Sequence, residues 1–424
     1  MASKLQAPLA AIVAIALSML GCGGPANQAG QTKPAAAAID AIKIGLLAPF
    51  NTQPGEGIRN GVKLAVEEIN AAGGVDGNPL QVIEINDEYS AEKTVRGYQR
   101  LAGRDGVVAV LGVAGDGIFP IMEQLARYKV PMITTGTGSD RLTDMVGGNP
   151  ERYKWFFRVM HKSSELGDVT ADFAIHCLAE KYGLKKFAIM VEDDIWTKYV
   201  RDIWAKRLNG NSGTKVVYSG TFGSETKDFS VLLQQIMDSK ADYILDASSR
   251  VDATTYLKRW AAVNGPPIGA IPTGAGTKRY YDLIGDQGRY VVSVATLPSP
   301  ENPLTDKSGK WWETYFARFG DPAYTSAYSY DAVYILADAL KRAGGERDAD
   351  KLVAALEATD YPGVMARWVF NKDHHSRYGP GYRVIPILQY LEPGPRGYKV
   401  IWPPDRAATS FVRKGQPVKV AALR

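Results

Sequence analysis

Short apolar runs alternate with amphipathic segments along most of this chain. The early apolar runs have the length of buried parallel strands and cover 41–50, 79–87, 107–115 and 130–135. Helical spacing of apolar side chains separates them, first at Ile58, Val62, Val66 and Ile69. Further helical patterns cover 91–106 and 118–129. This alternation predicts a parallel sheet with helices on both faces.

The same alternation restarts near residue 168. Helical patterns cover 168–183, 196–210, 229–239 and 251–265. Strand patterns cover 185–193, 214–222 and 241–248. The two halves do not align residue by residue, so the duplication is one of architecture and not of sequence. We expect a second parallel sheet with its own core.

The last part of the chain breaks the alternation. A strand pattern at 289–300 runs into prolines, helices are expected at 311–320 and 327–345, and a late hairpin at 381–394 and 398–405. We therefore expect an α/β protein of two doubly wound parallel-sheet lobes, joined by a hinge of several crossing segments. The expected bounds are 41–158 with 297–370 for the first lobe, and 159–296 with 371–424 for the second.

The N-terminus departs from this pattern. An apolar run from about Pro8 to Leu20 is too short to span a bilayer comfortably and has the length of a signal-peptide core. Its ending, Met-Leu-Gly-Cys at 19–22, resembles the lipobox of bacterial lipoproteins, which implies that Cys22 is lipidated. The alternative is an ordinary secretory signal with an incidental cysteine. We interpret 1–22 as a lipoprotein signal peptide and 23–40 as a flexible tether.

Composition narrows the class of function. The 424 residues are 45% hydrophobic and 22% charged, as in soluble globular proteins of more than one domain. The net charge is +5, but basic and acidic residues are mixed and no basic run with aromatic residues occurs, so nucleic acid is not an expected partner. Cys22 and Cys177 are the two cysteines, which leaves no internal disulfide if the first is acylated.

The sequence contains none of the common motifs of catalytic or metal sites that we searched for. The four histidines form no His-Glu-x-x-His frame, and no nucleophile elbow or phosphate loop follows a predicted strand. The adjacent pair His374 and His375 points in different directions, which favours a solvated turn over a metal site. We therefore expect a protein that is not an enzyme, with no cofactor and no metal.

Candidate binding residues follow the carboxyl ends of predicted strands, where ligands of open α/β sheets bind. In the first lobe they are Gly115, Asp116, Gly136, Thr137, Gly138 and Ser139. Glycine allows a ligand to approach backbone N–H groups, which can hold a carboxylate. In the second lobe, Trp196 and Asp252 follow strands, and Asp252 could receive an ammonium group. The alternatives are tight turns for the glycine loops, surface packing for Trp196 and a helix cap for Asp252.

Several stretches together resemble one protein family. They include "IKIGLLAPF", "GIRNGVKLAVEEINAAGGVDGNPLQVIEIND", "GVVAVLGVAG", "YKVPMITTGTGSD" and "VIWPPDRAA". They are similar to the branched-chain amino-acid (Leu/Ile/Val) type of periplasmic binding protein, which has the type I two-lobe fold and serves ABC importers. The resemblance covers nearly all of Ile42 to about Arg406 and is most specific between Asn60 and Pro79.

The resemblance implies roles for the candidate residues. The loop 136–139 would bind a ligand carboxylate and ammonium with help from 114–117, Trp196 would stand where the family often has Tyr, and Asp252 where it often has Glu. This chain departs from the family in a short loop after its first strand and in Thr137-Gly138, where the family has Ala-Thr.

The implied function is an extracytoplasmic binding protein, lipid-anchored to a membrane. It would deliver an amino acid or a similar small ligand to the permease subunits of an ABC transporter. Two alternatives stay open at the level of sequence. One is an amide, urea or an aromatic acid as the ligand, and the other is a ligand-sensing module that signals to a partner receptor.

Overall fold

The computed structural model describes residues 41–416 except 273–274, 276–277, 345–347 and 395–396. The expected signal peptide 1–22 with Cys22, the expected tether 23–40 and the segment 417–424 lie outside the described residues. Within the described part of the chain, no helix is long and apolar enough to cross a membrane.

The first sheet has five parallel strands in the order β2-β1-β3-β4-β5. Its strands are β1 (Ile42–Ala48), β2 (Leu80–Asn86), β3 (Val110–Ala114), β4 (Met132–Gly136) and β5 (Phe156–Arg158). The central strands β1, β3 and β4 are almost wholly buried, as expected for continuous apolar runs in a sheet covered on both faces. Ala114 pairs with Gly136, so the two glycine-rich loops begin side by side.

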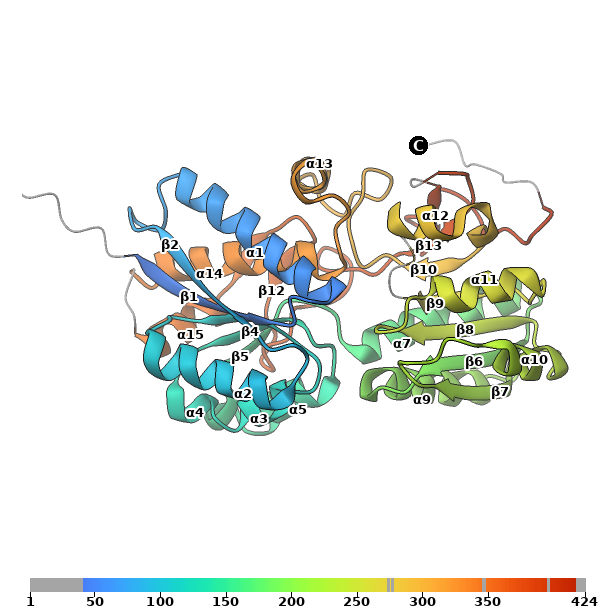
Figure 1. Cartoon of the computed structure of the whole chain (residues 1–424), viewed down its shortest axis with the longest axis horizontal. Coiled ribbons are helices and arrows are strands. Elements are labelled where there is room, and N and C mark those ends of the chain that lie inside the picture. Colours follow the sequence, from blue (N-terminus) through green and yellow to red (C-terminus); the bar gives the residue numbers. More distant parts are fainter. Residues whose placement is uncertain (1–40, 273–274, 276–277, 345–347, 395–396, 417–424) are drawn as a thin grey trace, which may run out of the picture. The chain divides into compact units, whose positions relative to one another are not determined.

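Helices cover both faces of the first sheet (Figure 1). They are α1 (Gln53–Ala71), α2 (Ala91–Arg100) continued by η1 (Leu101–Asp105), α3 (Ile118–Met122), α4 (Leu125–Tyr128), α5 (Asp140–Gly148), α6 (Pro150–Tyr153), α13 (Ser308–Phe319), α14 (Thr325–Arg342) and α15 (Ala349–Glu357). The single helix expected at 118–129 is two short helices, α3 and α4. The small antiparallel pair β11 (Asp360–Pro362) and β12 (Arg367–Val369) completes this part.

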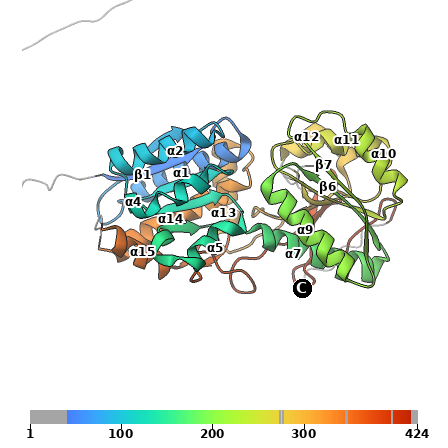
Figure 2. The same ribbon diagram turned by 90° about the horizontal axis from the view of Figure 1, so that it is seen from below.

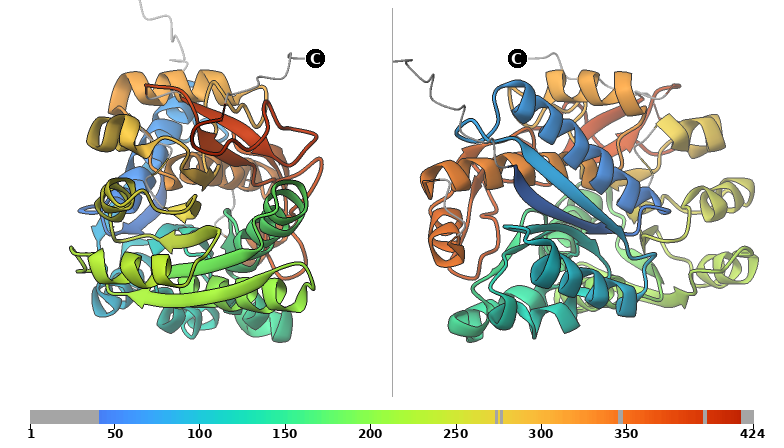
Figure 3. Two further views of the ribbon diagram at one scale, coloured as in Figure 1. Left: turned by 90° about the vertical axis from the view of Figure 1, so that its right-hand side faces the viewer. Right: turned by 60° about the vertical axis from the view of Figure 1, so that its left-hand side comes forward.

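The second sheet has seven strands in the order β14-β13-β10-β9-β8-β6-β7. They are β6 (Lys186–Glu192), β7 (Lys215–Phe222), β8 (Tyr243–Ser248), β9 (Gly269–Pro272), β10 (Val292–Val294), β13 (Ile387–Tyr390) and β14 (Tyr398–Trp402). The first five are parallel, and β13 and β14 add the expected hairpin as an antiparallel edge, drawn red in Figure 3.

Two hydrophobic clusters pack on opposite faces of the second sheet. Its helices are α7 (Ser163–Asp172), η2 (Phe173–Ala179), α8 (Glu180–Tyr182), α9 (Ile195–Gly210), α10 (Ser230–Asp238), α11 (Thr254–Ala262), α12 (Lys278–Ile284) and η3 (Gly285–Gly288). Helices α7 and α9 lie side by side on one face (Figure 2), while α10, α11 and α12 cover the other. Cys177 is a buried free thiol in the first of these clusters.

The chain is therefore an α/β protein with two lobes, each built on a mainly parallel sheet, which confirms the fold expected from the sequence. Core residues of the first sheet come from 42–160 and again from 311–370, and those of the second from 166–294 and again from 385–411. The chain thus passes between the sheets more than once. The domain bounds given above stay a prediction.

Candidate functional site

A cavity of about 260 Å³ is lined by residues from both sheets and from the segments that connect them. Pockets for drug-sized ligands usually enclose about 300–1,000 Å³, so this cavity, which lies just below that range, suits a smaller molecule. It lies at the carboxyl ends of β4, β8, β9 and β10, which contribute Gly136, Ser249, Pro272 and Val294. This is the edge at which open α/β sheets bind ligands.

Gly136 and Gly138 form the first sheet's share of the lining. They follow β4, whose neighbour β3 ends in an unusual backbone conformation. Val113 has φ of 55°, which is strained for a β-branched residue. Its carbonyl oxygen accepts hydrogen bonds from the hydroxyls of Thr134 at 3.1 Å and Thr137 at 3.2 Å. The strained strand end is thus held in place by the loop that lines the cavity.

Thr137, Gly115 and Ser139 belong to the same loops but do not line the cavity. The Thr137 hydroxyl also lies within 3.3 Å of the Gly115 carbonyl oxygen, so it ties the two glycine-rich loops together. Gly115 has φ of 80°, and a Cβ there would lie 2.7 Å from the ring of Tyr89. The Ser139 carbonyl accepts a hydrogen bond from Arg158 at 2.6 Å. These residues shape the loops without facing the cavity.

Trp196 and Ser249 form the matching wall of the second sheet. Trp196 stands at the start of α9, and its indole Nε1 donates to the Ser249 hydroxyl over 3.2 Å. The turn that carries Ser249 is held by the buried carboxylate of Glu192. This carboxylate accepts hydrogen bonds from the backbone N–H of Ser249 at 2.7 Å and from Arg250. Trp196 was among the binding residues expected from the sequence, whereas Ser249 and the carboxylate of Glu192 that holds its turn were not.

Asp252 and Asp116 are not among the lining residues. Asp252 is exposed, and its Oδ1 accepts from the backbone N–H and the hydroxyl of Thr254 at 2.9 and 2.8 Å. Thr254 is the first residue of α11, whose N-cap is Ala253, so the Asp252 carboxylate is engaged in the turn just before the helix. Partial burial and the negative charge of Asp194 raise the pKa of Asp116, while Arg250 lowers it. The structure thus brings together Gly136, Gly138 and Trp196 of the eight expected residues.

His161 and Ser163 add polar groups that the sequence analysis did not single out. They lie where the chain leaves β5 for α7. Burial lowers the pKa of His161 to about 3, so its imidazole is neutral at physiological pH. Its Nδ1 lies 3.3 Å from the Tyr328 hydroxyl. The Ser163 hydroxyl donates to the Gly138 carbonyl oxygen over 3.0 Å, next to a backbone hydrogen bond between the same residues.

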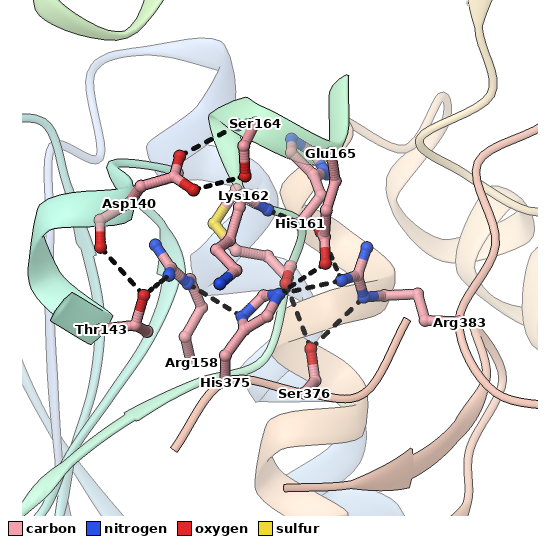
Figure 4. A network of polar contacts seen from close by, with 12 residues as sticks. Asp140, Thr143, Arg158, His161, Lys162, Ser164, Glu165, His375, Ser376 and Arg383 are labelled. Carbon is pink, nitrogen blue, oxygen red and sulfur yellow. Dashed lines mark hydrogen bonds and ion pairs between the residues drawn. The ribbon is translucent and has the colours of Figure 1, made fainter. Parts of the chain in front are cut away.

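A buried polar network adjoins the start of α7, close to Ser163 (Figure 4). The Arg158 guanidinium donates to the Thr143 hydroxyl and to His375 Nδ1 over 2.9 and 3.1 Å. Since Nδ1 accepts, Nε2 carries the proton and donates to Glu165 Oε1 over 2.8 Å. Arg383 pairs with the other oxygen of Glu165. The network joins β5, the start of α7 and the segment 375–383. The solvated turn expected at His374 and His375 is wrong, because both side chains are buried.

The rest of the lining is largely apolar. It includes Leu166, Ile271, Val294, Ala295, Leu297, Pro298, Pro322 and Leu388. Aromatic side chains of α13 and its surroundings add Trp312, Phe316 and Tyr324, and the rings of Trp312 and Phe316 stack at 4.8 Å. Strand β10 lies within the strand pattern expected at 289–300, whereas β9, which also carries part of this lining, is only four residues long and was not predicted. Among the described residues, no group of His, Cys, Asp and Glu could hold a metal ion.

Comparisons with known proteins agree with this geometry. A model of the periplasmic binding protein family matches residues 41–384. An amino acid binding protein of Pseudomonas aeruginosa is 24% identical over 79% of this chain and 87% of its own length. A Leu/Ile/Val-binding protein homolog of Brucella melitensis is 25% identical over 78% of this chain and 83% of its own length.

Solved structures share the fold. The branched-chain amino acid transporter substrate binding protein of Streptococcus pneumoniae, solved with isoleucine, has a TM-score of 0.72 at 20% identity and covers 86% of this chain and 100% of its own. An ABC transporter solute binding protein of R. palustris, solved with benzoate, has a TM-score of 0.71 at 20% identity, with coverage of 84% and 94%. The chain therefore belongs to the periplasmic binding protein family.

Proposed function

We propose that this chain captures an amino acid or a related small polar ligand in the cavity between its two sheets and delivers it to the permease of an ABC importer. The observation that carries the proposal is the lining itself. Gly136 and Gly138 of one sheet face the same cavity as Trp196 and Ser249 of the other. A ligand that touches both walls binds better when the walls are close, and this difference in affinity favours closure about the hinge.

The polar groups at the cavity suit a carboxylate. Gly136 and Gly138 leave the backbone accessible, and Ser163 and Ser249 bring hydroxyls. The neutral imidazole of His161 adds a hydrogen-bonding group without a charge. The acidic side chains of the lining, Glu301 and Asp321, come from the region around α13 and not from the second sheet. An ammonium group would therefore be received there and not at Asp252.

We further propose that the protein does not alter its ligand and that its N-terminus carries a lipid. The ligand would be released unchanged, because the relatives are binding proteins, and recovery of an unaltered ligand by mass spectrometry tests this. Cys22 would carry the lipid that holds the protein on the outer side of a membrane. Replacement of Cys22 by Ser should then abolish lipid incorporation into the N-terminal peptide.

The binding proposal is tested by a thermal-shift screen of the purified chain, refolded to remove any ligand carried through purification. The probes are aliphatic amino acids, the same acids without their amino group, aromatic carboxylates, short amides and urea. A ligand at a hundred times its dissociation constant stabilises the folded form by about 2.7 kcal/mol, and this raises the melting temperature by about 5–10 °C. Absence of a shift with every probe would contradict the proposal.

A serine pair provides a matched test of the site. Ser163→Ala removes a hydroxyl from the cavity lining but keeps the backbone hydrogen bond to Gly138. We expect ligand affinity to fall about three- to tenfold, as for the loss of one hydrogen bond. Ser164→Ala is the control, because that hydroxyl bonds to Asp140 and does not line the cavity. Calorimetric titration should show the loss for the first variant alone.

A further inference from the structure

His161 is a buried side chain with one polar atom open to the cavity. The residue is 5% exposed and lines the cavity where the chain leaves β5 for α7. Its Nδ1 contacts the Tyr328 hydroxyl, whereas its Nε2 has no hydrogen-bond partner among the described residues. Nε2 is nevertheless not one of the polar atoms that are buried without a partner. The small exposed surface of His161 therefore includes Nε2, and this atom faces the cavity.

Tyr328 determines which nitrogen of His161 carries the proton. Tyr328 is 1% exposed in the first turn of α14, and its ring packs edge-on against the rings of His161 and Trp368. Among the described residues, the Tyr328 hydroxyl has one hydrogen-bond partner, His161 Nδ1 at 3.3 Å. If Nδ1 carried the proton, the buried phenol proton would have no acceptor, which is costly. The hydroxyl therefore donates to Nδ1, and the imidazole proton is on Nε2.

The imidazole of His161 also stays neutral. Burial lowers its pKa to about 3, and the charges of Arg383 and Arg158 act in the same direction, while Glu165 opposes them. A neutral imidazole with its proton on Nε2 and its Nδ1 occupied presents one N–H donor to the cavity and no acceptor. An ammonium group can only donate, so it has no partner at this atom.

The segment that carries His161 lies against the glycine loop of the first sheet. A Cβ at Gly138 would lie 3.5 Å from the His161 carbonyl oxygen and 3.4 Å from the Ser163 hydroxyl oxygen. The lining residues that the structure describes include no Lys and no Arg. Neutral donors would therefore have to hold an anionic group here, and hydrogen bonds to an ionised acceptor are stronger than those between neutral groups.

We propose that His161 binds the carboxylate of the ligand through its Nε2–H, and that Tyr328 is the positioning residue that keeps the proton on this nitrogen. This inference rests on the proposed function, since the contact belongs to the same cavity. The ligand class is a small carboxylate whose acid group lies between His161 and Gly138. Any ammonium group of the ligand lies away from His161.

The tautomer is measured by heteronuclear NMR of the histidine nitrogens, with His161 identified as the signal that disappears in His161→Gln. At neutral pH the wild-type chain should show a protonated Nε2 and a non-protonated, hydrogen-bonded Nδ1. Addition of leucine, 4-methylpentanoate or benzoate should move the Nε2–H proton downfield for each acid that binds. In Tyr328→Phe the Nδ1 signal should move toward that of an imidazole nitrogen without a hydrogen bond, a change that a merely structural role of Tyr328 would not cause.

Two substitutions of His161 test the contribution of the donor. His161→Phe keeps a ring against Tyr328 and removes the N–H group, so affinity for the bound acid should fall about tenfold to a hundredfold, as for the loss of a hydrogen bond to a charged group. His161→Gln is the matched control, because its side-chain amide can place an N–H group near the position of Nε2. It should recover most of the affinity in calorimetric titration.

The outcomes separate this inference from the proposed function. The inference is wrong, and the binding function stands, if the proton is found on Nδ1, if an acid binds without moving the Nε2–H signal, or if amides or urea bind and no acid does. It is also wrong if His161→Phe binds the acid as wild type does, or if His161→Gln loses as much affinity as His161→Phe. If none of these acids and none of the other thermal-shift probes bind, the proposed function and the inference fall together.

Discussion

Two buried aspartates, Asp331 and Asp246, show how the hydrogen-bond partners of a side chain determine what its charge does to stability. Asp331 and Asp246 are both fully buried, and burial raises their pKa values to about 6 and about 7. Asp331 receives three hydrogen bonds, from the backbone N–H groups of Val364 and Met365 and from the indole of Trp368. Asp246 receives one from the hydroxyl of Tyr256, and its Oδ1 has no partner among the described residues. Their charges therefore affect stability differently.

The raised pKa of Asp246 predicts a pH-dependent stability. Its value in the unfolded chain is about 4, so between about pH 4 and pH 7 the folded state binds a proton that the unfolded state does not. Stability therefore falls as pH rises through this window. Asp246→Asn should be more stable than wild type at pH 8, on the order of 2 kcal/mol, and the difference should shrink toward pH 4. Denaturant unfolding at both pH values measures it.

Asp331→Asn is the contrasting variant. In this variant an NH2 group would replace one of the two carboxylate oxygens, each of which accepts a hydrogen bond from a backbone N–H group. At least one of these N–H groups would then face another donor. We expect a loss of about 2–4 kcal/mol at pH 8, because buried donors lose their acceptor. Equal behaviour of the two variants would contradict the roles assigned to these carboxyls.

At the scale of elements, helices α1 and α14 pack closely because glycines stand at their contact. Helix α1 begins at the side-chain cap of Thr52, which accepts from the Gly55 N–H at 3.2 Å. A Cβ on Gly61 would lie 2.2 Å from the carbonyl oxygen of Ser326 in α14. The helical pattern of α1 and its end were predictable from sequence, but its partner lies more than two hundred residues away in the chain and was not.

Gly61→Ala should therefore destabilise the protein, since the methyl group would push the two helices apart. We expect a loss of about 1–3 kcal/mol, as for overpacked cores. Gly309→Ala in α13 is the control, because a Cβ there meets nothing within 4 Å. Alanine favours a helix over glycine, so this variant should gain about 0.5–1 kcal/mol. Thermal unfolding of both variants compares the two positions, and a stable Gly61→Ala would refute the close packing.

At the scale of the whole molecule, the crossing segments are held together by one buried acid. Burial opposes ionisation of Glu165, but Arg383, His375 and the Lys162 N–H outweigh it and hold the pKa of Glu165 below its ordinary range. An acid with a lowered folded pKa stabilises the protein at neutral pH. This contribution disappears when pH falls through that folded pKa. Glu165 therefore connects α7, which lines the cavity at Leu166, to the segment that carries His375 and Arg383.

Glu165→Gln should leave the buried guanidinium of Arg383 without its ion-pair partner. We expect a loss of about 3–5 kcal/mol at neutral pH, as for broken buried ion pairs. The loss should shrink only at strongly acidic pH. Glu357→Gln is the control, since Glu357 is half-exposed, bonds to the buried His374 and can keep that hydrogen bond as an amide, so it should contribute about 0–1 kcal/mol. Urea unfolding of both variants tests this, and equal losses would contradict the central role of Glu165.

The sequence by itself determined the α/β alternation, the parallel strands and the loops at their carboxyl ends, because these depend on local periodicity and on glycine. That was enough to predict Gly136, Gly138 and Trp196 as neighbours across a cavity. Only the tertiary structure decided that Asp252 stays outside the lining, that His161 and Ser163 line the cavity, and that the cavity reaches Tyr398. These features depend on contacts between segments far apart in the chain, and no local pattern encodes which side chains such contacts bury.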